Sequence, residues 1–186
     1  MILTLIKTLT AAGDSSLSFV DGTASVVLDS TYAEYMFVFT DIGPATNDVD
    51  FSFQVNATDD AGGGYDTSLI TSTYFAAYNN ESDSARGVNY ITANDLAQSS
   101  SFQMLSESVD SQSDLSTSGI LHLFSPSSTT YVKHFYSRMS SSHINDYVYD
   151  EFVAGYINDT TAITQIRFKF DANNINNATI QMYGIA

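Results

Sequence analysis

Strict alternation of apolar and polar residues near the end of the chain is the feature that most constrains its fold. In residues 163–170, ITQIRFKF, the apolar residues Ile166, Phe168 and Phe170 alternate with the polar residues Gln165, Arg167 and Lys169. A period of two residues is that of a β-strand with one buried and one solvated face. The segment therefore predicts a sheet that is packed on one side by large aromatic residues.

Strand patterns recur along the chain, separated by short clusters of Gly, Asn, Asp, Ser and Pro that favour turns. We predict an all-β fold, an antiparallel β-sandwich that is jelly-roll-like, as a single domain over residues 1–186 with at most one short helix. The segment 34–41, EYMFVFTD, is apolar on both faces, which is typical of a central strand. The other predicted strands cover residues 2–9, 25–29, 50–56, 119–124, 130–138, 147–157 and 180–183.

One segment, residues 93–109, has a pattern compatible with a helix, and its serines limit that helix to one or two turns. Asn94 or Asp95 would cap it, and residues 106–118 read as a surface loop. The inward residues of the helix would be Leu96, Phe102 and Leu105. The predicted core of the sandwich consists of Phe37, Phe39, Phe51, Phe53, Phe135, Phe168 and Phe170.

The chain of 186 residues carries a formal net charge of −15, with six basic residues. Such a charge repels polyanions and anionic membrane surfaces, so we expect neither nucleic acid nor membrane as a partner. The acidity serves surface solubility or, alternatively, a cation site. The chain has no cysteine, which excludes disulfides and thiolate zinc sites. It also has no signal-peptide pattern at its start and no apolar stretch of membrane-spanning length.

The acidic, glycine-rich segment 58–66 is the best candidate for calcium. Asp59, Asp60 and Asp66 surround three glycines, but the segment lacks the calcium-loop spacing and a closing bidentate Glu. It reads as a hairpin loop or as a weak, local calcium site. His122 and His134 lie in neighbouring strand patterns and could form a metal pair, although strand histidines are more often hydrogen-bonded to a neighbour.

The sequence offers no supported catalytic set. Asp150 and Glu151 are adjacent on a predicted strand, so they point to opposite faces and cannot share a substrate. His143 stands apart in a turn, and no nucleophile elbow or phosphate-binding loop is present. We therefore expect no enzyme activity and assign no catalytic, cofactor-binding or metal residues.

Tyrosine is the remaining signal, because its ring has an apolar body and a polar tip. Such residues fill half-buried strand positions, or they gather where a protein meets another protein or a sugar. The candidates are Tyr74, Tyr78, Tyr90, Tyr131, Tyr136, Tyr147, Tyr149, Tyr156 and Tyr183.

Several phrases of the chain resemble short virion structural proteins of tailed bacteriophages, especially marine and cyanobacterial phages. They include LDSTYAEYMFVFTDIGPATND, YFAAYNNESDS, GILHLFSPSSTTYVKHFYSR, AGYINDTTAITQIRFKF and the final NATIQMYGIA. The segments HLFSPSSTT and MYGI carry the resemblance most specifically, and it spans nearly the whole chain. The terminal Ala186 departs from the basic ending that is more usual in the group.

The resemblance implies an all-β module without catalytic residues, located in the virion and assembled in the host cytoplasm. Its expected partners are other capsid or tail proteins and further copies of itself, as a decoration, cement or fibre-associated subunit. The alternative is a carbohydrate- or receptor-binding module of a tail fibre, with a host surface glycan as the ligand. The position on head or tail and the oligomeric state stay open at this point.

Overall fold

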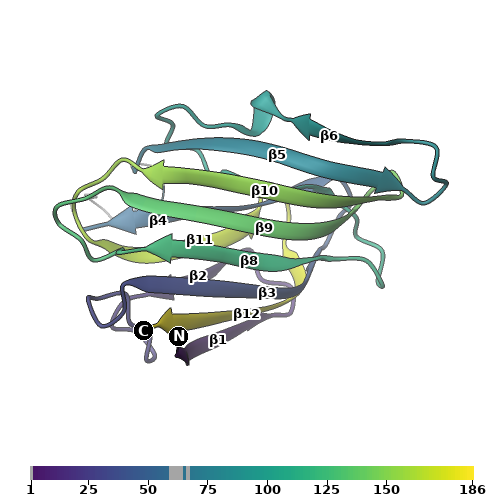
Figure 1. The fold of residues 1–186 in the computed structure, drawn as a ribbon. Helices are drawn as coiled ribbons and strands as arrows, with labels where there is room; N and C mark the ends of the chain where they lie inside the picture. The colour runs from purple at the N-terminus through teal and green to yellow at the C-terminus, as the bar shows by residue number, and fades with distance from the viewer. Residues whose placement is uncertain (1, 59–64, 66–67) are drawn as a thin grey trace.

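The computed structural model describes residues 2–58, 65 and 68–186, and these residues form twelve antiparallel strands and one turn of 3-10 helix, η1 (Thr92–Asn94). Figure 1 shows the strands lying in two layers. The strands are β1 (Leu3–Ala11), β2 (Leu17–Val20), β3 (Glu34–Pro44), β4 (Val49–Ala57), β5 (Ile70–Asn80), β6 (Arg86–Tyr90), β7 (Gln103–Val109), β8 (Thr117–Phe124), β9 (Lys133–His143), β10 (Tyr147–Ile157), β11 (Ile163–Phe170) and β12 (Ile175–Ile185).

The larger layer has the strand order β1-β12-β3-β8-β9-β10-β5-β6, and the smaller one has the order β7-β4-β11-β2. The layers join where Val109, at the end of the edge strand β7, pairs with His143 at the end of β9, a strand in the middle of the larger layer. The first strand, β1, pairs with the last strand, β12, so the two ends of the chain lie together in Figure 1. The predicted all-β antiparallel sandwich is therefore confirmed.

Aromatic side chains fill the space between the two layers. The ring of Phe168 in β11 lies 5.4 Å from that of Phe37 and 5.1 Å from that of Phe39, both of which come from β3 in the opposite layer. The seven phenylalanines predicted as core are all at most 2% exposed, which confirms that prediction. The inward face of β11 is the apolar one that the alternation predicted.

The outer face of the smaller layer is covered, in part by the chain that leads from η1 into β7. Gln54 of β4 is fully buried, and its amide donates to the backbone oxygens of Ser100 (2.9 Å) and Ser101 (3.1 Å). The guanidinium of Arg167 lies 4.0 Å from the centre of the Tyr65 ring. This covering leaves the large layer as the one with an open outer face.

Three local predictions were wrong. In place of the predicted helix, residues 93–109 include the end of η1 and the whole of β7. The polar side chains of Gln103 and Ser106, for which the sequence pattern indicated exposure, are buried and hydrogen-bonded in that strand. The predicted cap, Asp95, instead accepts a hydrogen bond from the backbone N–H of Tyr74 at 2.7 Å. The predicted loop 106–118 accordingly shortens to the segment between β7 and β8.

The third error is the strand predicted over residues 25–29. Val26 and Leu28 are buried there, but they follow a turn in which Ala24 and Ser25 have positive φ angles. The backbone N–H of Leu28 donates to the carboxylate of Asp21 at 2.8 Å rather than to a strand. In the ranges described above, no helix is long and apolar enough to cross a bilayer.

Candidate functional site

The outer face of the large layer is an open surface rich in exposed apolar side chains. Strand register places them on one side of the sheet, because residues paired between neighbouring strands share a face. Apolar side chains that gather on an exposed face mark sites of interaction in soluble proteins. We call this surface the outer face; its most exposed apolar members are Leu3, Leu5, Phe75, Val88, Tyr90, Tyr136 and Val148.

Charges at the centre of the outer face are paired with one another. The guanidinium of Arg138 in β9 donates two hydrogen bonds of 2.8 Å to the carboxylate of Asp150 in β10. The same guanidinium lies 4.9 Å from the centre of the Phe152 ring, which stacks on Phe75 at 4.8 Å. A chain of net charge −15 thus carries a central sheet surface on which opposite charges cancel locally.

One end of the outer face is hollowed into a shallow groove of about 420 Å³. Its floor is the small side chain of Ala154 in β10, which is exposed between Tyr136 of β9 and Thr73 of β5. The groove forms because Ala154 is short and its neighbours are aromatic. The ring-bearing residues around it are Phe124, His134, Phe135, Tyr136 and Tyr156.

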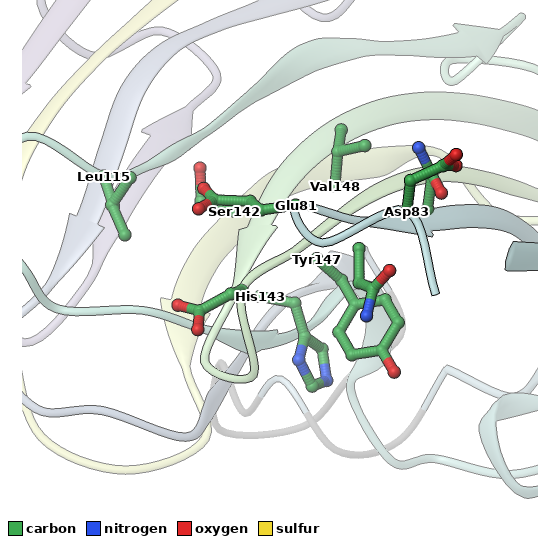
Figure 2. Close-up of a pocket in the computed structure, with 10 residues that line it drawn as sticks. Glu81, Asp83, Leu115, Ser142, His143, Tyr147 and Val148 are labelled. Atoms are coloured by element: carbon green, nitrogen blue, oxygen red, sulfur yellow. The ribbon is translucent and has the colours of Figure 1, made fainter. Parts of the chain in front are cut away.

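A second hollow of about 290 Å³ lies at the opposite end of these strands, between the β5–β6 loop and the β9–β10 hairpin (Figure 2). The His143 and Tyr147 rings meet edge to face there at 6.0 Å. The acidic residues at its rim belong to the loops themselves, and Asp83 pairs with Arg86. Burial lowers the pKa of His143, which favours a neutral imidazole. Nδ1 of His143 accepts a hydrogen bond from the backbone N–H of Asn145 at 3.2 Å, so the ring is held by the hairpin itself.

The most perturbed carboxyl group is Glu151, which points inward from β10 and is fully buried. The Tyr74 hydroxyl donates to its Oε1 at 2.6 Å, the Glu107 backbone N–H donates to the same atom at 2.7 Å, and the Ser141 hydroxyl donates to Oε2. Burial raises the pKa of Glu151 to about 7 despite these hydrogen bonds. Because it has no exposed surface, we assign it a structural role, linking β10 to β5, β9 and the edge of the smaller layer.

The residues considered for chemistry from the sequence are dispersed. Asp150 and Glu151 point to opposite faces, as their adjacency predicted. His122 stacks on Tyr136 at 4.6 Å and its Nδ1 contacts the carboxylate of Glu34, whereas His134 packs near Tyr156. Among residues 2–58, 65 and 68–186, no three His, Asp or Glu side chains are placed to hold a metal ion. The candidate calcium residues Asp59, Asp60 and Asp66 lie outside the described residues.

The tyrosines divide between the core and the surface. Tyr74 is fully buried, and desolvation raises the pKa of its hydroxyl group. Tyr78, Tyr147 and Tyr149 form a half-buried cluster with His143 on the inner side of the sheet. The exposed members are Tyr90, Tyr131 and Tyr136, and those half-buried on the outer face are Tyr156 and Tyr183.

An all-β sandwich with one open aromatic sheet face is therefore the class of protein that the geometry defines. Neither the comparison with protein families nor the comparison with curated proteins finds a match. Among solved structures, the chain is similar to the VP2 subviral particle of infectious bursal disease virus at 11% identity and a TM-score of 0.18. That alignment covers 99% of this chain and 41% of the other, and at this TM-score it carries no argument about fold or function.

Proposed function

We propose that the protein is a non-enzymatic structural subunit of a bacteriophage particle that attaches to other capsid or tail proteins through its outer face. The observation that carries the proposal is the number of exposed apolar side chains on the outer face of an eight-stranded sheet whose inner face packs on the smaller layer. The similarity of the sequence to short virion proteins of tailed phages supports the phage assignment. The location would be the virion, after assembly in the host cytoplasm.

Pairing between copies of the chain is part of this proposal. Chains of net charge −15 repel one another, so they associate best through a surface on which charge is locally cancelled. The free edges of the large sheet are less suited to pairing, because β1 has a register irregularity between Leu5 and Lys7 and β6 has five residues. We therefore expect face-to-face contact, with the outer face as the contact surface.

Two glutamates placed on the outer face should disrupt its association with partners. Val88→Glu together with Val148→Glu alters side chains that are 71% and 52% exposed, so the fold should tolerate both changes. We expect self-association in sedimentation experiments, and attachment to particles lacking the protein, to weaken by about tenfold or more, because a charge would be desolvated.

The matched control is Ser113→Glu together with Ala172→Glu, which adds the same charge at two exposed loop positions. This control should bind like the unmodified protein. Equal weakening in both double variants would point to net charge alone as the cause, and would contradict attachment through the outer face. Density for the protein in an electron-microscopy map of the particle, with the outer face turned to solvent, would also contradict it.

A carbohydrate-binding module of a tail fibre is the second candidate function. The observation that favours it is the groove, since exposed aromatic rings around a small floor provide the flat apolar surface on which a sugar ring can stack. The two functions use different parts of the outer face and do not exclude each other.

A further inference from the structure

The groove offers hydrogen-bond donors as well as aromatic rings. The Thr71 hydroxyl oxygen accepts hydrogen bonds from the backbone N–H of Gln98 at 3.1 Å and from its side-chain amide at 2.6 Å. The same amide lies 3.4 Å from the hydroxyl oxygen of Tyr156. Neither hydroxyl donates its hydrogen to another described residue, so both are available to a ligand that carries acceptor oxygens.

The amide beside these hydroxyls is held in position before any ligand arrives. The side-chain amide of Asn158 donates a hydrogen bond to Oε1 of Gln98 at 2.6 Å. This bond orients the Gln98 amide so that its Nε2 faces Thr71. Gln98 itself has a φ angle of +50°, a left-handed conformation that is uncommon for a residue other than glycine. Thr71 and Tyr156, which line the groove, are thus both held by the Gln98 amide beside it.

We propose that this groove binds a neutral pyranose sugar. One face of the sugar ring would stack on Tyr136 above Ala154, and its hydroxyl oxygens would accept hydrogen bonds from Thr71 and Tyr156. Among the described residues that line the groove there is no carboxylate, lysine or arginine, and the remaining basic group is the His134 ring. The volume of about 420 Å³ falls within the range of small-molecule sites.

A neutral ligand also suits the charge of the whole molecule. The net charge of −15 repels anionic sugars, whereas a neutral sugar gains the apolar and hydrogen-bond contacts without that cost. The inference rests on the second of the two proposed functions and is independent of assembly through the rest of the outer face. Because binding is measured on the isolated protein, a negative result leaves the structural role intact.

The test is saturation-transfer NMR with maltose, cellobiose, lactose and chitobiose on the full chain. We expect at least one of them to bind with a dissociation constant on the order of 1 mM, as suits a single shallow site. Ala154→Phe fills the groove from an exposed position and should abolish binding while leaving the melting temperature nearly unchanged. Tyr136→Ala should weaken binding by about tenfold, because each stacking aromatic contributes on the order of 1 kcal/mol or more.

Tyr131→Ala is the control, because Tyr131 is the most exposed tyrosine and lies outside the groove. It should bind sugar like the unmodified protein. Failure of all four sugars to bind, or binding that Ala154→Phe leaves unchanged, would overturn the proposal. Binding of a proline-rich peptide in the groove in place of the sugars would overturn it as well and would assign the site to a protein partner.

Discussion

Replacing Phe168 with alanine is expected to lower the free energy of unfolding by about 3–5 kcal/mol. Phe168 is fully buried, and its ring contacts rings from both layers of the sandwich. Removal of the ring leaves a cavity at a point where β2, β3 and β4 all converge, and surrounding strands that are fixed by hydrogen bonds cannot collapse into it. The phenylalanines around it are Phe19, Phe37, Phe39, Phe51 and Phe53.

The measurement is chemical or thermal denaturation of Phe168→Ala beside Tyr131→Ala. For a chain of this size the expected loss corresponds to a melting temperature lower by roughly 6–20 °C. Tyr131→Ala also removes an aromatic ring, but from a side chain that is 72% exposed, and should change the stability by about 0.5 kcal/mol or less. Similar melting temperatures for the two variants would show that the inward face of β11 is assigned incorrectly.

The stability of the protein is expected to fall as the pH rises from about 4.5 to about 7, because of Glu151. Its pKa is raised from 4.5 to about 7 in the folded protein, so the folded state keeps a proton that the unfolded state releases in this window. Burial of the resulting charge then opposes folding. At about 1.4 kcal/mol for each pH unit, the loss from this one group amounts to about 3 kcal/mol, and it is complete above pH 7.

Glu151→Gln tests this, because glutamine keeps acceptors for Tyr74 and the Glu107 backbone but does not titrate. The difference in unfolding free energy between about pH 5 and about pH 8 should shrink in this variant. Desolvation also raises the pKa values of Asp50 and Glu107, so a smaller slope of the same sign should persist. Asp150→Asn changes the neighbouring, outward carboxylate and should retain the full slope. A slope unchanged by Glu151→Gln would contradict the assignment.

Period-two alternation identified the strands whose two faces differ in polarity, whereas β3 was predicted from a run of residues that is apolar on both faces. In β11 and β4 the inward residues are phenylalanines or aliphatic residues and the outward ones are polar, so period-two alternation identifies them. The strand β5 was missed because both of its faces carry rings and alanines: Tyr74 and Ala76 point inward, and Phe75 and Ala77 point outward. With apolar residues on both sides, alternation vanishes.

A different physical cause concealed β7. Its inward Ser106 is hydrogen-bonded to Thr117 at 2.8 Å, and Gln103 donates its amide to backbone oxygens. Sequence patterns treat such residues as solvated, whereas a buried polar side chain that finds its partners is stable inside a protein. Those partners lie elsewhere in the sequence and become visible only once the fold is known.

The groove could not be predicted for a related reason. Tyr136, Ala154 and Thr73 lie side by side because β9, β10 and β5 pair in one particular register, and a shift by a single residue would turn the short Ala154 toward the core. The sequence did identify tyrosine as the residue type to follow. The pairing between strands decides which tyrosines surround the small Ala154 side chain. No single segment of the sequence contains that information.

The pairing of the first strand with the last has a consequence for how the protein is made. As the chain leaves the ribosome, β1 and β2 have no partners until β12 and β11 have been synthesised, since each pairs with one of these late strands. Contacts that close such long loops form slowly. The apolar β1 must therefore stay unpaired until β12 has been synthesised, and until then its exposed strand edges are open to aggregation.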